Sequence, residues 1–252
     1  MQVNSSQMIR EKEMLKEAKH WMSVITKSIE TGNFAKRDDV LDVFEQLKFN
    51  GNTNLHIFLL ASRGGIDSYL DHLYVFLDIV KKHKIKPFVH LFSDGQDVPQ
   101  KQFLVDLPEI EEKIKEAGGM LASISGRFYA MDEDENWDRI DKVWKAFLNF
   151  KGTPTFKNAK EYVKSQYENT YDKWIVPAVS QEYADGPGLK EKDILVNLNF
   201  LKYGTRQLSH VLVGSADLYS HSPTIIPENL GLFAMVDDIK ILLLGSFFES
   251  NE

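Results

Sequence analysis

The residues best placed to do chemistry in this 252-residue chain lie between positions 123 and 142. A short apolar run, which predicts a strand, leads into a loop with Arg127, Tyr129 and Asp132, and an amphipathic helix is predicted from Trp137 onward. Loops that follow strands are where open α/β sheets place their ligand-binding groups. Arg127 is suited to binding an anion, whereas the acids that follow it would repel one. This opposition of charges is the main evidence that the sequence offers about function.

Other polar loops follow predicted strands at 62–69, 93–100 and 199–207. The carboxyl ends of parallel strands lie at one edge of a sheet, so these loops and Arg127 are expected to form one site. Turn chemistry alone also explains the Gly, Asp and Ser in such loops, and on pattern alone this explanation is slightly favoured. Gly64-Gly65 lacks both phosphate-binding glycine motifs and is interpreted as a tight turn.

The spacing of apolar residues predicts the elements around these loops. Buried strands are predicted at 55–62, 86–94, 120–125 and 194–200, with further candidates at 231–236 and 239–245. Helices are predicted at 15–29, 38–49, 68–83, 101–117, 136–150 and 156–168. Alternating strands and helices indicate an α/β fold whose largely parallel sheet has helices on both faces. We expect a single α/β domain over residues 36–252, preceded by an N-terminal helical extension over residues 1–35.

Composition narrows the class of protein. Hydrophobic residues make up 43% of the chain, enough for a sizeable core, and the net charge of −7 argues against nucleic-acid binding. The chain has no cysteine, so disulfides and thiolate sites are excluded. No apolar run approaches the ~20 residues of a membrane span, and the N-terminus lacks an apolar signal core. A cytosolic location is the default expectation, and a mitochondrial location as part of a complex is the alternative.

Two further sets of residues are candidates for catalysis. His210, Asp217 and His221 match no spacing of metal ligands on a helix, so surface scatter is the better explanation and no metal is predicted. Ser5 could act as a nucleophile only beside a base or a metal, and no residue near it in the sequence qualifies. No cofactor is predicted.

At its polar loops the chain resembles the cofactor-independent phosphoglycerate mutase family, specifically the inserted phosphotransferase domain of that two-domain enzyme. The resemblance covers most of residues 20–210 in family order, and its most specific segment is ISGRFYAMDEDENWDR. The other segments that carry it are LHIFLLASRGGIDSYLDHL, VHLFSDGQDVPQ, FKNAKEYVKSQYENTYDKWIVPAV and KEKDILVNLNFLKYGTRQL. The resemblance implies the α/β fold of that domain.

The resemblance also places Ser5 at the position of the family's nucleophile. After Ser5, the family's motif N-S-E-V-G-H continues here as Ser6, Gln7, Met8 and Ile9, so its Glu, Gly and His are missing. The family enzyme further needs a second domain that holds two divalent metals, and the residues that flank the matching segments are too few to supply it. We therefore expect no metal-assisted phosphoryl transfer by this chain.

The substrate-binding residues of the family have changed more than its fold-determining ones. Asp97 and Arg127 are kept, whereas Asp67 replaces a histidine, Arg63 replaces an acid, and non-cationic residues replace four arginines. The vestigial substrate-binding positions are Asp67, Gln96, Asp97, Arg127, Glu133, Leu201 and Gly204. Lys202 and Arg206 lie close by in the sequence and could compensate only if their loop were rebuilt.

Magnitudes indicate what these replacements do to binding. A hydrogen bond to a charged group contributes roughly 1.5–3 kcal/mol, so losing four or five removes on the order of 6–15 kcal/mol. A micromolar ligand is bound by only about 8 kcal/mol. We therefore expect phosphoglycerate not to bind usefully.

Two functional hypotheses follow from these losses. The leading one is a catalytically inactive domain that acts as a structural, accessory subunit of a larger protein assembly. The alternative is a binding module for another phosphorylated metabolite, or half of a split mutase whose metals lie on another chain. In the alternative, the ligand would be held by Arg127, Asp97, Asp94, Lys202 and Arg206. The N-terminal helix and the apolar tail at 239–248 are the candidate partner contacts, although intramolecular packing is favoured for the tail.

Overall fold

A computed structural model describes residues 5–51, 53–212, 227–237 and 245–249 of the chain. Its centre is a sheet that joins eight described strands in the order β4-β5-β3-β2-β1-β6-β7-β8. All neighbouring strands pair in parallel except β3 and β5, which are antiparallel. The largely parallel sheet of an α/β fold is therefore confirmed.

The strands are short and mostly buried, as continuous apolar runs predict. They are β1 (Leu55–Ala61), β2 (Pro87–Ser93), β3 (Met120–Gly126), β4 (Thr155–Phe156), β5 (Ala178–Ser180), β6 (Ile194–Asn197), β7 (Gly231–Val236) and β8 (Gly245–Phe248). The α-helices are α1 (Ser5–Glu30), α2 (Asp38–Phe49), α3 (Leu70–Lys82), α4 (Gln102–Glu116), α5 (Arg127–Ala130), α6 (Trp137–Phe147), α7 (Ala159–Gln166), α8 (Gln181–Ala184) and α9 (Lys202–Leu212). Two 3-10 helices, η1 (Phe34–Lys36) and η2 (Asp172–Trp174), complete the described elements. None of the described helices is long and apolar enough to span a membrane.

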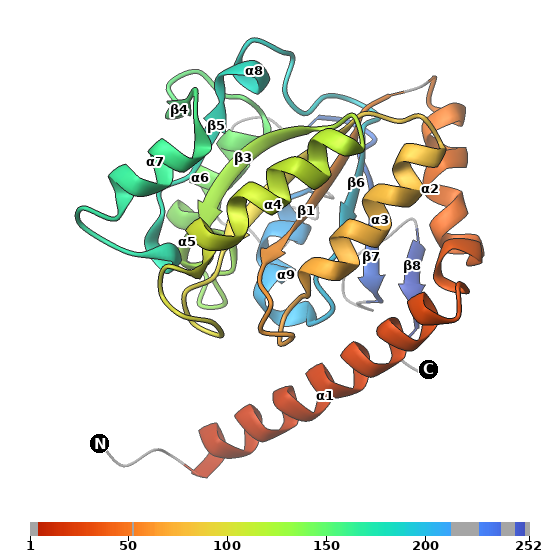
Figure 1. Cartoon of the computed structure of the whole chain (residues 1–252), viewed down its shortest axis with the longest axis horizontal. Coiled ribbons are helices and arrows are strands. Elements are labelled where there is room, and N and C mark those ends of the chain that lie inside the picture. Colours follow the sequence, from red (N-terminus) through yellow and green to blue (C-terminus); the bar gives the residue numbers. More distant parts are fainter. Residues whose placement is uncertain (1–4, 52, 213–226, 238–244, 250–252) are drawn as a thin grey trace.

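The central strands send alternate side chains into two hydrophobic layers. On β1, Ile57 and Leu59 join the larger cluster, which also takes apolar residues from α1, α2, α3 and α4. Phe58 and Leu60 point to the other face and join a cluster with residues of α6 and α9. Figure 1 shows α3 and α4 covering one face of the sheet, with α6 and α9 behind it. Helices on both faces are thus confirmed.

Three sequence predictions need correction. The segment 199–207, predicted as a polar loop, contains the start of α9, because Leu208, Val211 and Leu212 form an apolar face that packs in the second cluster. The short strands β4 and β5 were missed, since two or three residues carry no readable periodicity. The helix predicted over 156–168 is shorter, because Asn158 accepts a hydrogen bond from Glu161 N and begins α7 there.

The apolar tail is described only in part. Residues 245–248 form β8, which pairs in parallel with β7, so this part of the tail packs within the chain. Phe247 and Phe248 are buried against Phe34 of η1. Residues 239–244 lie outside the described part of the chain.

Helix α1 packs on the hydrophobic core mainly through its second half, while its first half contributes the partly buried Met14 and the ion pair of Arg10 with Glu133. Ala18, Trp21 and Ile25 are buried in the larger cluster, whereas Met8 and Ile9 are about half exposed. Figure 1 shows the first half of α1 projecting past the edge toward which β1, β7 and β8 point. The later residues of the N-terminal extension predicted over 1–35 therefore belong to the core of the domain.

The two halves of α1 should differ in their effect on stability. Trp21→Ala is expected to lower the free energy of unfolding by about 3–5 kcal/mol, because it removes a large buried side chain and leaves a cavity. Ile9→Ala, in the projecting half, should change it by less than about 0.5 kcal/mol. Urea denaturation of both variants measures the difference. Equal losses in the two variants would mean that Ile9 packs on the domain as closely as Trp21 does.

Candidate functional site

The candidate site lies at the carboxyl edge of the sheet, where three neighbouring strands end. Asp67 is in the loop after β1, Asp94 directly follows β2, and Arg127 is the first residue of α5, directly after β3. The backbone at this point is tightly fitted. A Cβ on Gly126 would lie 2.3 Å from the carbonyl oxygen of Lys173, so only glycine allows β3 to end where it does. The glycine therefore helps to fix the position of Arg127 at the start of α5.

Arg127 binds three carboxylates, and we call these four residues the Arg127 cluster. Its Nη1 donates to Asp94 Oδ1 and Asp97 Oδ2, both at 2.7 Å, and its Nη2 donates to Asp67 Oδ2 at 2.8 Å. Three of the four loops predicted to share one site therefore meet in this cluster. The acids that follow Arg127 in its own loop do not oppose it, because Asp132 pairs with Arg139 and Glu133 pairs with Arg10. The carboxylates that surround Arg127 come from the loops after β1 and β2.

Further hydrogen bonds hold the carboxylates in place. Asp94 Oδ2 accepts from the Ser62 hydroxyl at 2.7 Å, and Asp94 Oδ1 accepts from the backbone N–H groups of Gln96 and Asp97. Gly95 has a φ of +68° in this turn, which favours glycine. Asp94 was named in the sequence analysis only as part of the alternative, yet it is the most connected acid of the cluster. Its place directly after a strand was the available signal.

The Arg127 cluster is buried and carries an excess of negative charge. The side chain of Arg127 is 11% exposed and that of Asp67 is 7% exposed. When all three carboxylates are ionised they exceed the one guanidinium by two charges. Burial raises the pKa of Asp67 to about 6, with Arg127 opposing the rise and Asp97 adding to it. Burial also works against the charge of Arg127, but the three carboxylates outweigh it and raise its pKa.

Leu201 and Gly204 occupy a closed part of the site. Leu201 is fully buried, and the backbone N–H of Phe200 donates to the carbonyl of Asp67 at 2.8 Å. A Cβ on Gly204 would lie 2.5 Å from Met131 Cε and 3.6 Å from Asp67 Oδ1. A longer side chain at position 204 would therefore need Met131 to move.

The other predicted positions lie at the rim or outside the cluster. Gln96 is exposed and accepts a hydrogen bond from Lys173 Nζ at 3.0 Å. Glu133 is exposed and pairs at 2.9 Å with Arg10 of α1. Ser5 is the first residue of α1, at the end that projects from the domain (Figure 1). Lys202 and Arg206 belong to α9.

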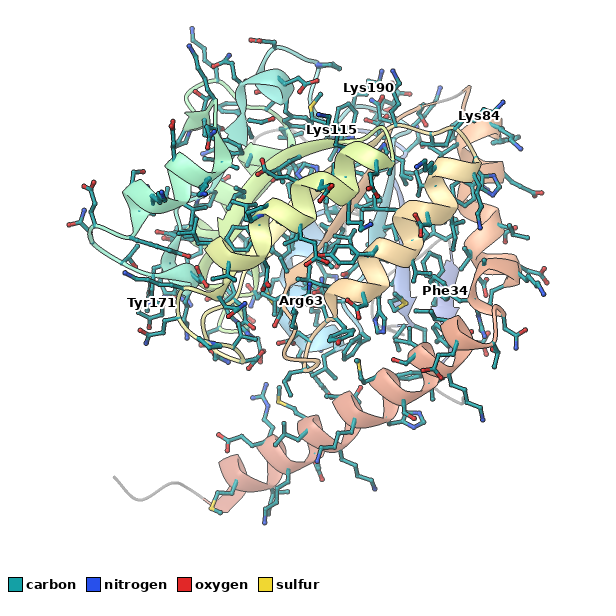
Figure 2. All side chains as sticks on the ribbon, in the orientation of Figure 1. Phe34, Arg63, Lys84, Lys115, Tyr171 and Lys190 are labelled. Atoms are coloured by element: carbon teal, nitrogen blue, oxygen red, sulfur yellow. The ribbon has the colours of Figure 1, made fainter. Side chains whose placement is uncertain are left out.

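Arg63 points away from the Arg127 cluster. It pairs with Asp71 at 3.2 Å, Asp106 at 3.3 Å and Glu109 at 2.6 Å, which belong to α3 and α4. Figure 2 shows it below these two helices. The cation at this position therefore joins the helices of one face and adds no positive charge to the cluster.

Asp132, singled out by its loop, has a structural position. It is buried and accepts from Arg139 Nη1 at 2.7 Å, from the Asn136 side chain at 2.8 Å, and from the backbone of Asn136. These bonds order the turn that begins α6. In the part of the chain that the structure describes, no group of three or more His, Asp or Glu side chains is arranged to hold a metal ion. We assign no metal step to these residues.

Comparison with known proteins places the chain in a family. The family model described as the BPG-independent PGAM N-terminus matches residues 25–237. The chain belongs to this family. Among its curated relatives, the 2,3-bisphosphoglycerate-independent phosphoglycerate mutase of Mycoplasmoides gallisepticum is 37% identical over 217 residues, which cover 85% of this chain and 42% of the relative. The protein of the same name from Staphylococcus epidermidis is 40% identical over 195 residues, covering 76% and 38%.

The part of these relatives that the chain matches is thus about two fifths of their length. A solved structure, of Leishmania mexicana phosphoglycerate mutase at low cobalt concentration, matches with a TM-score of 0.74 and 21% identity. The match covers 86% of this chain and 41% of that one, and at this identity it supports the fold alone. The resemblance read from the sequence is confirmed at the level of the family and of the fold.

The pKa of Asp67 leads to a testable pH dependence. Its folded value of about 6 lies above the unfolded value of about 3.9, so the stability that this carboxyl contributes is present below pH ~4 and is lost as the pH rises through about 6. Asp67→Asn removes this loss. We expect the stability of the variant relative to the wild type to rise by about 2–3 kcal/mol between pH 4 and pH 7.

Urea denaturation across this pH range measures the effect. Asp71→Asn, which removes a more exposed carboxylate paired with Arg63, is the control and should show no such rise. Asp172 has its pKa raised to about 6 by burial as well, but it is unchanged in both variants and cancels from the comparison. Parallel pH profiles for Asp67→Asn and the wild type would show that Asp67 is not strained in the cluster.

Proposed function

We propose that this mutase-family domain has no phosphoglycerate mutase activity and acts as a structural, accessory subunit of a larger protein assembly. The observation that carries the proposal is the Arg127 cluster. Arg127 is the cation kept from the family pattern, and it is already bound by three carboxylates at 2.7–2.8 Å. An anion that approached it would meet two excess negative charges.

The energetics support this reading of the cluster. The three carboxylates take both N–H groups of Nη1 and one of Nη2, so a phosphate or carboxylate would compete with them for the charge of Arg127. Displacing one buried partner would cost about 3–5 kcal/mol. The carboxylate left behind would then face the ligand, with a repulsion of about 4 kcal/mol per pair of charges at 4 Å near a protein surface. A micromolar ligand has only about 8 kcal/mol of binding free energy to offset these costs.

Packing around α9 adds to the proposal. Neither Leu201 nor Gly204 carries a positive charge. Leu201 is buried and Gly204 lies against Met131, so the space beside the cluster at these positions is filled by apolar groups. Glu133 lies at the rim and forms an ion pair with Arg10, so the positive charge of Arg10 is paired outside the cluster. The loss of binding is thus distributed over several loops and is not the effect of one substitution.

The projecting half of α1 is the surface that we propose for partner contact. Met8, Leu15 and Met22 recur at a spacing of seven residues and so lie along one side of the helix. Met22 packs against Gly65, whereas Leu15 and Met8 continue the same stripe with exposed fractions of 45% and 46%. A stripe that begins in the domain and extends past it is suited to packing against another protein.

Calorimetry with 3-phosphoglycerate tests the first part of the proposal. We expect no binding tighter than about 1 mM at pH 7, because the free energy needed to open the Arg127 cluster exceeds what the remaining groups supply. Arg127→Ala should leave this result unchanged. The matched control is Arg63→Ala, which removes a cation that does not face the cluster.

Micromolar binding that Arg127→Ala abolishes and Arg63→Ala preserves would contradict this prediction. It would favour the second candidate, a binding module or one half of a split mutase. That candidate is motivated by the convergence of Arg127, Asp94 and Asp97 at the carboxyl edge of the sheet, where α/β proteins bind their ligands. Mutase activity on addition of manganese and a separate metal-binding chain would identify the split form.

The accessory role is tested in native extract. The chain should migrate in a complex larger than its own mass, and Met8→Ser combined with Leu15→Ser should release it as a monomer, because both changes remove exposed apolar surface. Phe49→Ser is the control, since Phe49 is 86% exposed on α2 and lies outside the stripe. Size-exclusion chromatography with native mass spectrometry measures the outcome. A wild-type chain that stays monomeric and without partners would count against the accessory role.

A further inference from the structure

A cavity lined by residues outside the Arg127 cluster, the first of them Lys142 of α6, has the opposite charge. It has a volume of about 330 Å³ and is formed by the end of α6, the turn at 150–154 and the segment that precedes β5. Its lining contains Lys142, Lys145 and Lys151, and no acid contributes to it. In a chain of net charge −7, this is a local reversal of sign.

The rest of the lining is apolar or aromatic. Phe150, Pro154, Val176 and Pro177 supply it, and Val176 is 37% exposed although it is a large hydrophobic residue. The ammonium group of Lys145 lies 5.8 Å from the centre of the Phe150 ring. Cationic groups therefore stand directly beside a hydrophobic surface. Pockets of this size, with an apolar lining and a few charged groups, are typical of small-molecule sites.

Hydrogen bonds hold the walls of this cavity in place. The Thr153 hydroxyl donates to the Phe150 carbonyl at 2.8 Å, and the Phe150 N–H donates to the Lys145 carbonyl at 2.9 Å, so the turn is closed onto the end of α6. On the opposite wall the Tyr162 hydroxyl donates to the Val176 carbonyl at 2.7 Å. The Val179 N–H donates to the Pro154 carbonyl and joins the two walls. A ligand would find the pocket formed in advance, which lowers the entropic cost of binding.

The lysines differ in how far they are already neutralised. Lys145 pairs with Asp141 one turn earlier on α6. Lys142 lies 5.4 Å from the ring of Tyr129, and the described part of the chain provides no carboxylate partner for Lys142 or Lys151. Both are exposed at the rim. They are the groups that would contact the charged end of a ligand.

We propose that this cavity binds a small amphipathic organic anion, in which an aromatic or branched aliphatic group carries a carboxylate, sulfonate or phosphate. The hydrocarbon part would lie against Phe150, Val176 and Pro177, and the anionic group would lie between Lys142 and Lys151. The inference does not depend on the accessory role, because none of these residues belongs to the Arg127 cluster or to α1.

Fluorescence titration tests the proposal with two aromatic probes. One is 8-anilinonaphthalene-1-sulfonate, and the other is its uncharged relative N-phenyl-1-naphthylamine. The folded wild-type chain should bind the sulfonate more tightly than the uncharged probe. This preference should fall in 0.5 M salt, because screening weakens exposed ion pairs.

Variants assign the binding to this cavity. Lys142→Gln combined with Lys151→Gln should weaken binding of the sulfonate on the order of tenfold and leave the uncharged probe unchanged, since only the charged contacts are lost. Val176→Asp should weaken both probes. The matched control is Lys81→Gln combined with Lys82→Gln, which changes the net charge equally on the exposed end of α3 and should have no effect. Circular dichroism confirms that each variant is folded.

Three results would overturn the proposal. The first is absence of binding of either probe to the wild type. The second is equal affinity for the sulfonate in the wild type and in the Lys142/Lys151 double variant. The third is an equal loss in the Lys81/Lys82 control, which would assign the effect to net charge. None of these results bears on phosphoglycerate binding or on the oligomeric state, so failure here is distinct from failure of the proposed function.

Discussion

The bonds between one guanidinium and three carboxylates govern the carboxyl edge of this domain. Arg127 follows β3, Asp94 and Asp97 follow β2, and Asp67 follows β1, so the ion pairs tie three neighbouring loops together. The cluster is therefore a structural element of this edge. Without the arginine, three carboxylates would face one another with little water, and without the acids a buried cation would have no partner.

The sheet itself is stabilised by apolar packing rather than by these charges. The central strands are held by side chains that alternate between two apolar layers, and β1 is buried along its whole length. Loop residues at the carboxyl edge can therefore change their charge while the sheet persists, because the interactions that stabilise each part are different. Membership of the family identifies the scaffold, whereas the chemistry depends on the side chains that the loops present.

Two other surfaces of the molecule carry features that the Arg127 cluster lacks. The first half of α1 presents an apolar stripe beyond the domain, and the turn after α6 presents lysines beside an apolar surface. Each gives a physical basis for recognition: burial of hydrophobic area in one, and charge combined with hydrophobic area in the other. These two surfaces are the ones that we propose for the interactions of this chain.

The sequence by itself determined the fold class and three of the loops that meet at the carboxyl edge, because apolar periodicity and strand-to-loop order are local properties that side-chain type encodes directly. The family followed from the resemblance of its loop segments. The sequence also identified Arg127 and Asp67 as decisive positions. It did not show that Asp67 binds Arg127, that Asp94 is the most connected acid, or that Arg63 points toward α3 and α4. The start of α9 was not predicted either, because the apolar face of this helix is stabilised by the hydrophobic cluster on which it packs. These facts were decided by the tertiary structure, because an ion pair or a packed face depends on which residues distant in the chain come within a few ångströms of each other.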